Sequence, residues 1–237
     1  MKTYIWTLPT RLFHWLLAIS FAVAYLLGGD EGYLSLHAAL GSMIAGLILF
    51  RIIQGFSGPE YARFRDFPVS PASIRQFISN MKQSKETHPG HNPLASIIML
   101  CILITALASA MSGMLILASG ETGMFGLRIT TGFNPESLGE LHEILANAFL
   151  VLVGIHLTGI LADTIFHPAN GTIFSIFTGY KKIQAKDAAS SAFHSVFSVF
   201  WFAVPLLIFF YVLKYQPLPP GEKDQQEQVD ESNEDKD

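Results

Sequence analysis

The sequence predicts an all-α integral membrane protein, with a four-helix transmembrane bundle followed by a fifth transmembrane helix. Of its 237 residues, 50% are hydrophobic and only 14% are charged. Its mean hydropathy of +0.38 is too high for an ordinary soluble domain of this size. The few histidines inside the apolar stretches stand out against this background, so they are the first candidates for function.

Five apolar stretches approach or exceed the roughly 18 to 20 residues needed to cross a bilayer as a helix. They cover about residues 10–28, 34–54, 93–118, 140–166 and 193–213. The first stretch follows Lys2 and Arg11, as the apolar part of a signal peptide would. No convincing small-x-small cleavage site follows it, and a second apolar stretch comes at once. We therefore expect the first stretch to be a retained transmembrane helix.

The distribution of lysine and arginine predicts the orientation of these helices. Basic residues collect before the first stretch, between the second and third, and between the fourth and fifth, whereas the alternate loops carry mostly acids. On the basic side lie Lys2, Arg11, Arg51, Arg63, Arg65, Arg75, Lys82, Lys85, Lys181, Lys182 and Lys186. On the other side lie Asp30, Glu31, Glu121, Arg128, Glu136 and Glu140. We expect a multi-pass protein of the bacterial inner membrane, with its N-terminus cytoplasmic and its C-terminal tail periplasmic.

Three regions follow from this pattern. Residues 1–182 contain the four-helix domain, residues 183–215 the additional helix, and residues 216–237 an acidic tail. From Glu222 onward the tail has eight acidic and two basic residues, a composition that predicts disorder. Within the long basic loop, "PASIRQFISNMKQS" places Ile74, Phe77, Ile78 and Met81 at helical spacing, which predicts an amphipathic helix, either on the membrane surface or in solvent.

Four histidines pair by depth in the predicted bundle. His14 lies in the cytoplasmic half of the first helix, and His37 lies near the outer end of the second. The fourth helix carries His142 near its outer end and His156 deeper. Fourteen residues correspond to roughly 21 Å of rise and bring the last two side chains to within about 40° of one face. The expected pairs are His37 with His142 on the outside and His14 with His156 on the inside.

Each pair can present two imidazole nitrogens to one six-coordinate haem iron, whose other four ligands come from the porphyrin. Cys101 is the only cysteine, so there is no C-x-x-C-H site and any haem is non-covalent. Gly41, Gly139, Gly154 and Gly159 flank the histidines, either to make room for a porphyrin or to pack helices closely. The predicted fold is thus a four-helix transmembrane bundle holding two non-covalent b haems, plus a fifth helix.

The helix sequences also resemble the bacterial cytochrome b561 and nickel-iron hydrogenase b-type cytochrome superfamily. The resemblance covers about residues 4 to 182 and rests on "WTLPTRLFHWLLAISF", "LHAALGSMIAGLILFRII", "GHNPLASIIML" and "LGELHEILANAFLVLVGIHLTGILADTIFH". It implies a four-helix bundle with two b haems that exchanges electrons with quinone, and it implies the same four ligands: His14, His37, His142 and His156. The fifth helix and the acidic tail depart from the single-chain members of that superfamily.

Other polar residues near the basic side are weaker candidates. Arg11 and Arg51 are either partners of haem propionates or plain positive-inside anchors. His88 and His91 either border a quinone headgroup site or are ordinary interfacial histidines. We assign no ligand role to His167, His194 or the methionines of the third helix.

The predicted function is electron transfer across the membrane between the quinone pool and a periplasmic redox partner, either a hydrogenase, another oxidoreductase or a c-type cytochrome. We favour an electron-transfer subunit of a respiratory oxidoreductase over a stand-alone enzyme such as a superoxide:quinone oxidoreductase. The non-redox alternative is a proton or ion transporter, which the scarcity of intramembrane carboxylates beyond Glu143 and Asp163 disfavours. Membrane lipid is an expected partner, and nucleic acid is not.

Overall fold

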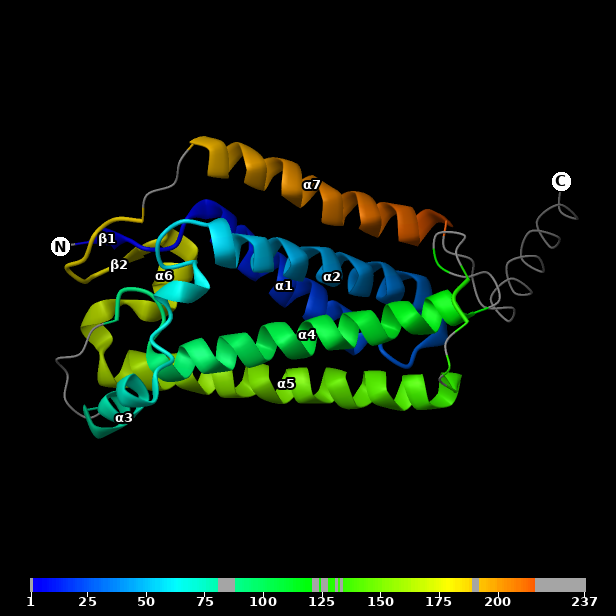
Figure 1. Ribbon diagram of the computed structural model, residues 1–237, viewed down its shortest axis with the longest axis horizontal. Coiled ribbons are helices and arrows are strands. Elements are labelled where there is room, and N and C mark those ends of the chain that lie inside the picture. The colour runs from blue at the N-terminus through cyan, green and yellow to red at the C-terminus, as the bar shows by residue number, and fades with distance from the viewer. Residues whose placement is uncertain are drawn as a thin grey trace, which may run out of the picture.

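Five long antiparallel helices dominate the computed structural model, which describes residues 2–80, 88–120, 124, 128–130, 132, 134–188 and 192–215 (Figure 1). They are α1 (Leu8–Leu26), α2 (Leu34–Ser57), α4 (Pro93–Ser119), α5 (Pro135–Phe166) and α7 (Ala192–Tyr215). Each contains a segment long and apolar enough to cross a membrane. The five predicted spans are confirmed, and the chain is a multi-pass membrane protein.

The start of α5 shows why helix ends are harder to predict than helix centres. α5 begins at Pro135, five residues before the predicted span, because a polar capped segment precedes its apolar part. The Asn134 side chain accepts a hydrogen bond of 3.1 Å from the backbone N–H of Glu136, and proline occupies the first helical position. Because of these features, α5 begins before its apolar segment does.

The four-helix bundle is held together through α2. α2 packs against both α1 and α4, and its central residues Leu47, Ile48 and Phe50 are fully buried. α5 packs along α4 and reaches α1 at Phe149, whose ring centroid lies 4.0 Å from that of Phe21, but it hardly approaches α2. Only Leu138 and Phe149 are buried on α5. The bundle is therefore well packed on its α2–α4 side, whereas most of the surface of α5 is left uncovered by protein.

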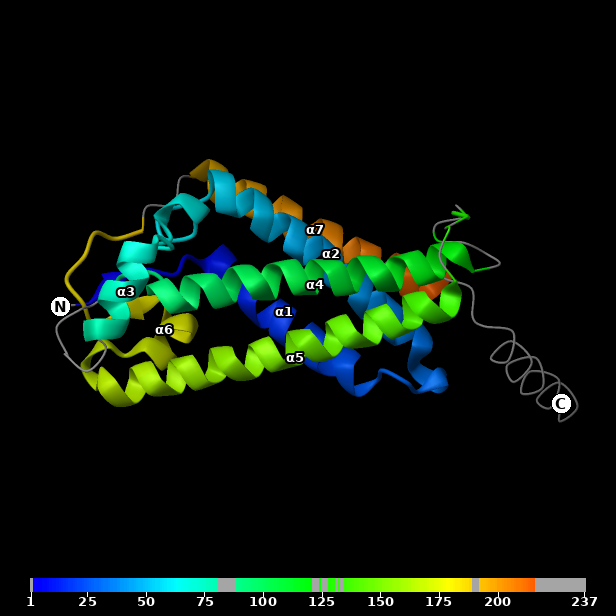
Figure 2. The same ribbon diagram turned by 60° about the horizontal axis from the view of Figure 1, so that its bottom comes forward.

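The fifth helix, α7, lies against α2, on the opposite side of the bundle from α5 (Figures 1 and 2). The contact is close at Gly46, where an added Cβ would lie 3.1 Å from Cγ of Pro205. Because α7 covers the outer side of α2, it does not take the place of any of the four bundle helices. This arrangement agrees with the predicted four-plus-one architecture.

Small elements gather at one end of the bundle, which we call the cap end. A two-stranded antiparallel sheet of β1 (Thr3–Tyr4) and β2 (Tyr180–Lys181) lies there with α3 (Pro71–Asn80) and α6 (Thr172–Thr178). Short 3-10 turns lie at Phe64–Asp66 and Pro168–Asn170 near this end, and another, Glu31–Tyr33, lies at the opposite end. The strands and α6 were not predicted, because elements of two to seven residues carry too little periodicity.

The N-terminus and the segment after α6 are fastened together at the cap end. The hydroxyl of Thr3 donates to the carbonyl of Ile183 over 2.7 Å, and the N–H of Ala188 donates to the carbonyl of Tyr4 over 2.7 Å. Gly179 has a φ of +89°, and a Cβ there would lie 2.6 Å from the Tyr4 ring, so this turn requires glycine. Residues 183–188, predicted as the start of the additional helical region, therefore pack on the first residues of the chain.

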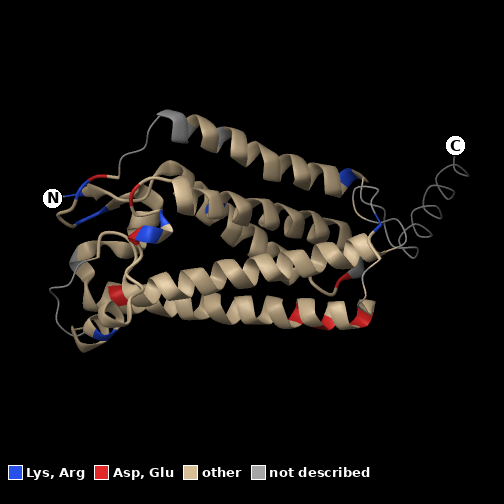
Figure 3. Ribbon diagram, in the orientation of Figure 1, with Lys and Arg blue, Asp and Glu red and all other residues tan. Residues whose placement is uncertain are grey.

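Two sequence predictions fall partly outside the described residues. The predicted amphipathic segment forms α3, but Met81, Lys82 and Lys85 lie outside the described residues, as do Glu121 and the acidic tail of residues 216–237. Among the described residues, most lysines and arginines lie at the cap end, together with several acids, whereas acids line the first turns of α5 at the opposite, distal end, where Lys214 ends α7 (Figure 3). The acids of this distal helix start are Glu136, Glu140 and Glu143.

Candidate functional site

His37 and His142 face each other at the distal end of the bundle. Their ring centroids lie 5.9 Å apart and the ring planes are inclined by 79°. His37 comes from the first turn of α2 and His142 from the second turn of α5. Two imidazoles bound to opposite sides of one metal ion, at about 2.0 Å each, place their centroids roughly 6 Å apart. The spacing of this pair suits two axial ligands of one iron.

Hydrogen bonds to backbone carbonyls fix which nitrogen of each ring carries the proton. Nδ1 of His37 lies 2.8 Å from the carbonyl oxygen of Ala24, and Nδ1 of His142 lies 2.9 Å from that of Ser109. Because a carbonyl oxygen only accepts, each Nδ1 carries the proton, and each Nε2 keeps its lone pair in the neutral ring. In metal sites, a histidine that binds the metal through one ring nitrogen is oriented by a hydrogen bond of this kind from the other nitrogen.

Three small residues of α4, the third membrane helix, contact the ring of His142. The hydroxyl of Ser112 lies 3.0 Å from Nδ1 of His142 and itself donates to the carbonyl of Ser109 over 2.8 Å. A Cβ added to Gly113 would lie 3.1 Å from Cε1 of His142. The ring of His142 therefore packs on a small, partly polar surface made by Ser109, Ser112 and Gly113. Sequence reasoning missed these residues, because small residues spaced along an apolar helix also serve ordinary packing.

His14 and His156 form the second pair, near the cap end. His14 lies in the second turn of α1, and His156 lies on α5 at fourteen residues, or roughly 21 Å of rise, from His142. The two imidazoles are close enough to influence each other electrostatically. Nδ1 of His14 is buried and has no hydrogen-bond partner among the described residues. The fold therefore places these two histidines within electrostatic range of each other, at the depth that their positions along α1 and α5 predicted.

Arg51 is a buried cation at the depth of this second pair. It is 2% exposed, and its guanidinium lies 5.2 Å from the centre of the Phe64 ring. Its Nη2 contacts the sulfur of Met99 at 3.9 Å, and its Nη1 has no partner among the described residues. No carboxylate of the described chain forms an ion pair with it. Burying a charge without a counter-ion costs free energy, so we expect an anion to bind beside Arg51.

Arg11, the other arginine predicted near the cofactor, is partly engaged by the protein. Its Nη1 donates to the carbonyl oxygen of Phe177, at the end of α6. Its Nε is buried and lacks a partner among the described residues. Arg11 therefore fastens α6 to α1 and retains one free donor.

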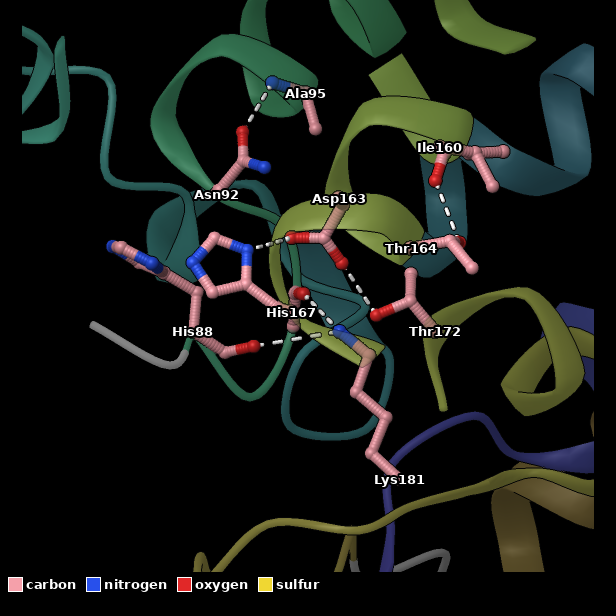
Figure 4. A network of polar contacts seen from close by, with 10 residues as sticks. His88, Asn92, Ala95, Ile160, Asp163, Thr164, His167, Thr172 and Lys181 are labelled. Atoms are coloured by element: carbon pink, nitrogen blue, oxygen red, sulfur yellow. Dashed lines mark hydrogen bonds and ion pairs between the residues drawn. The ribbon is translucent and has the colours of Figure 1, made fainter. Parts of the chain in front are cut away.

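A polar network, not predicted from the sequence, lies at the cap end (Figure 4). Lys181 is 6% exposed, and its Nζ donates to the carbonyl of Gly90 over 3.0 Å and to that of His88 over 3.4 Å. The Asp163 carboxylate accepts from the Thr172 hydroxyl over 2.6 Å and pairs with Nδ1 of His167 at 3.2 Å. No sequence signal distinguishes the buried Lys181 from the exposed Lys182 beside it.

The remaining histidines have separate surroundings. The ring of His91 packs against Trp6 at 4.9 Å and Phe67 at 5.2 Å, and its Nδ1 is buried without a partner in the described chain. Burial lowers the pKa of His91 well below its ordinary value, and the charges of Arg51 and Lys181 act in the same direction. The ring of His88 lies 5.7 Å from that of Phe77. His194 lies in the first turn of α7, away from the paired histidines in sequence and helix.

Open space lies in front of several glycines near the paired histidines. Gly41 follows His37 by four residues, Gly139 precedes His142 by three, and Gly159 follows His156 by three. At these spacings each glycine shares the face of its histidine. An added Cβ at any of the three would meet no protein atom within 4 Å. These glycines are therefore not used for close packing between helices, which was the alternative explanation.

The fold and the paired imidazoles define a class of protein: a membrane-embedded helix bundle with two histidine pairs, one toward each end. The family model described as prokaryotic cytochrome b561 matches residues 5–179, and the chain belongs to this family. It is therefore a membrane b-type cytochrome of electron transfer. Comparisons with the curated proteins and with solved structures gave no match.

The residues present fit b haem. Among the described residues, no group of three or more His, Cys, Asp or Glu side chains could hold a metal ion by itself. A pair of histidines suffices for haem iron, because the porphyrin supplies the other four ligands. The distal pair has the correct separation, each neutral ring keeps a lone pair on Nε2, and a sparsely covered α5 leaves room for a large ring. The unpartnered guanidinium of Arg51 suits a carboxylate such as a propionate.

Proposed function

We propose that the protein binds two b haems and carries electrons across the membrane between the quinone pool and a periplasmic redox partner. The observation that supports this most directly is the presence of two histidine pairs at opposite ends of one bundle, joined through α5. His37 and His142 would ligate the distal haem, and His14 and His156 the haem near the cap end. Bis-histidine b haem supplies reversible one-electron chemistry without an open coordination position.

The cap-end arginines complete this proposal. Arg51, buried and unpaired, would bind a propionate of the haem held by His14 and His156, and Arg11 would offer its remaining Nε–H to the same region. Both side chains hold their charge at all physiological pH values, so they stabilise an anion in the protein interior throughout. The role of Arg51 is the better supported, because Arg11 already donates to Phe177.

The charge distribution supports one orientation in the bacterial inner membrane. Lysine and arginine gather at the cap end, and the positive-inside rule would place that end in the cytoplasm. The distal haem would then lie near the periplasm, where a hydrogenase, another oxidoreductase or a c-type cytochrome would exchange electrons with it. The exposed acids at the start of α5 would face the same compartment.

Haem content tests the first part of this function. The full chain, purified in detergent, is expected to contain two non-covalent b haems in a pyridine-haemochrome assay, with a low-spin, dithionite-reducible spectrum. A colourless but folded protein would refute the proposal. It would restore the alternative of a proton or ion transporter, which membership in an electron-transfer family disfavours.

Transmembrane electron transfer tests the second part. Protein in liposomes with entrapped ferricyanide is expected to reduce it when a short-chain quinol is added outside, while empty liposomes do so far more slowly. Failure with haem-loaded protein would exclude the transmembrane route. A superoxide:quinone oxidoreductase would instead consume superoxide with quinone as acceptor and no other protein present, and this assay on the same preparation distinguishes the two functions.

A further inference from the structure

The Nδ1 atoms of the paired histidines have different surroundings at the two ends of the bundle. At the distal end, Nδ1 of His37 lies 2.8 Å from the carbonyl oxygen of Ala24, and Nδ1 of His142 lies 2.9 Å from that of Ser109. At the cap end, Nδ1 of His14 is buried and has no hydrogen-bond partner in the described part of the chain. Both distal rings therefore donate a hydrogen bond from Nδ1, whereas His14 donates none to a described residue.

Ser112 increases this difference at His142. Its hydroxyl donates to the carbonyl of Ser109 over 2.8 Å, so the Ser112 oxygen presents its lone pairs to Nδ1 of His142, which lies 3.0 Å away. The Nδ1–H of His142 thus lies beside two oxygen acceptors. Ser112 is 4% exposed, and a hydrogen bond is stronger in such an interior than in water.

Acceptors at Nδ1 change what the same ring offers to iron through Nε2. When an acceptor draws the Nδ1 proton away from the ring, negative charge builds up on the ring and Nε2 becomes a more basic ligand. A more basic ligand stabilises ferric iron more than ferrous iron, and hydrogen bonds of this kind are one means by which a protein sets the potential of a haem. The oxygens of Ala24, Ser109 and Ser112 therefore lower the potential of iron held by His37 and His142.

The buried charge at the cap end acts in the same sense. Arg51 is 2% exposed and forms no ion pair with a carboxylate of the described chain. Arg51 and His14 lie at the same level of the bundle, because Phe50 and Phe13, their neighbours in sequence, pack with ring centroids 6.4 Å apart. A buried guanidinium opposes the additional positive charge of ferric iron. It therefore raises the potential at this end of the bundle.

We propose that the chain holds its two haems at different potentials, low at the distal end and high at the cap end, and that Ser112 is a positioning residue that lowers the distal potential through His142. The inference rests on the proposed function, since it requires both haems. The transfer between them exchanges one electron and no proton. The distal iron is oxidised from ferrous to ferric, and the cap-end iron is reduced from ferric to ferrous. A single electron on the chain therefore resides mainly at the cap end.

Potentiometric titration of the full, two-haem chain in detergent, followed by haem absorbance, tests this assignment. Ser112→Ala removes one acceptor from His142, and Ser112→Thr keeps the hydroxyl. Ser42→Ala is the matched control, because the Ser42 hydroxyl is also buried in a membrane helix and donates to the Ala38 carbonyl of its own helix over 2.9 Å. Arg51→Met removes the buried charge at the other end. Each haem is thus addressed by a variant that keeps all four histidines.

The wild type is expected to titrate in two one-electron steps. Ser112→Ala should raise the midpoint potential of the lower step, because it removes the net contribution of about one hydrogen bond. We expect a two- to fivefold change in the one-electron equilibrium, which corresponds to roughly 20 to 40 mV. The upper step should not move, and both Ser112→Thr and Ser42→Ala should titrate as the wild type does. Arg51→Met should lower the upper step and leave the lower step in place.

Several results would overturn the inference. If Ser112→Ala moves the upper step, or Arg51→Met the lower one, the order of the two haems is reversed. Equal shifts from Ser112→Ala and Ser42→Ala would reduce Ser112 to a packing role. If a variant loses a haem, the missing step decides, because it must be the lower step for Ser112→Ala and the upper one for Arg51→Met. Failure of the proposed function has a different signature, since the wild-type chain would then not contain two haems before any titration.

Discussion

His37 and His142 meet at the distal end of the bundle with ring centroids 5.9 Å apart, although α2 and α5 hardly contact each other elsewhere. Each ring donates a hydrogen bond from Nδ1 to a backbone carbonyl, so each neutral ring keeps its lone pair on Nε2. We propose that this pair of side chains approaches across an otherwise unpacked interface because the two rings share a ligand.

Replacing either member of one pair is expected to remove one haem and spare the other. His37→Ala and His142→Ala should both lose the distal haem. His14→Ala and His156→Ala should both lose the cap-end haem. In each case the reason is that one imidazole binds haem iron much more weakly than two. A pyridine-haemochrome assay with redox titration measures which haem remains. His167→Ala is the control and should retain two haems, since this ring pairs with Asp163. Loss of different haems by His37→Ala and His142→Ala would contradict the pairing.

A bulky side chain in the space next to His156 should exclude the cap-end haem. Gly159→Leu points into this space on the face of His156, and we expect it to lose that haem while the helices still form. Gly154→Leu is the matched control, because residue 154 lies about 160° around the helix from His156 and faces away. Neither Cβ meets protein within 4 Å, so helix packing does not distinguish the two variants. Equal haem contents would show that lipid fills the space near Gly159.

Loss of the buried charge at Arg51 should lower the midpoint potential of the cap-end haem. Oxidation adds one positive charge to the iron, and a nearby guanidinium destabilises this oxidised form. Removing the guanidinium in Arg51→Met therefore makes the oxidised haem more stable. A shift on the order of 60 mV corresponds to a tenfold change in the one-electron equilibrium. Potentiometric titration measures it, with Arg65→Met as the control, since the Arg65 side chain is 72% exposed. An unchanged potential would separate Arg51 from the haem.

The contact between α2 and α7 should depend on the absence of a side chain at residue 46. Gly46→Leu would force atoms against Pro205, where a Cβ alone already comes within 3.1 Å. Overpacking of this kind costs about 1 to 3 kcal/mol. We expect a lower melting temperature in detergent with two haems still bound, because α7 lies outside the haem bundle. Leu207→Ala, at a position 68% exposed, should leave the melting temperature close to that of the wild type.

The stability of the folded chain should rise with pH through the titration of Lys181. Burial lowers the pKa of Lys181 from 10.5 in the unfolded chain to about 8 in the folded one. Between these values the unfolded chain holds a proton that the folded chain has released, so the free energy of unfolding increases with pH. Below about pH 8 both states are protonated and the full penalty of the buried charge remains.

Thermal unfolding across pH 7 to 11, roughly, covers this window. Lys181→Met should lack this contribution, and Lys182→Met should keep it, because Lys182 is exposed. If the two variants have the same pH dependence of stability, Lys181 does not carry the predicted titration.

The sequence by itself determined the five membrane helices, and it predicted the pairing of the four histidines, of which the structure shows His37 and His142 in ring contact. Long apolar stretches are recognised because a bilayer demands about 20 apolar residues in a row. The histidines pair because position along a membrane helix converts directly into depth, which puts His14 level with His156 and His37 level with His142. The chain's resemblance to the cytochrome b561 superfamily followed from the same helices, and the match over residues 5–179 confirmed it.

Only the tertiary structure decided which surroundings those helices create. Three features depend on how neighbouring helices are rotated, which local periodicity does not record. They are the close contact of α7 with Gly46, the contact of Ser109, Ser112 and Gly113 with His142, and the burial of Arg51. The β1–β2 pair joins the residues that flank the family match on either side, and Lys181 is buried there while Lys182 stays exposed. Depth is a property of one helix and can be counted along the chain, whereas burial is a property of several segments and exists only after they have packed.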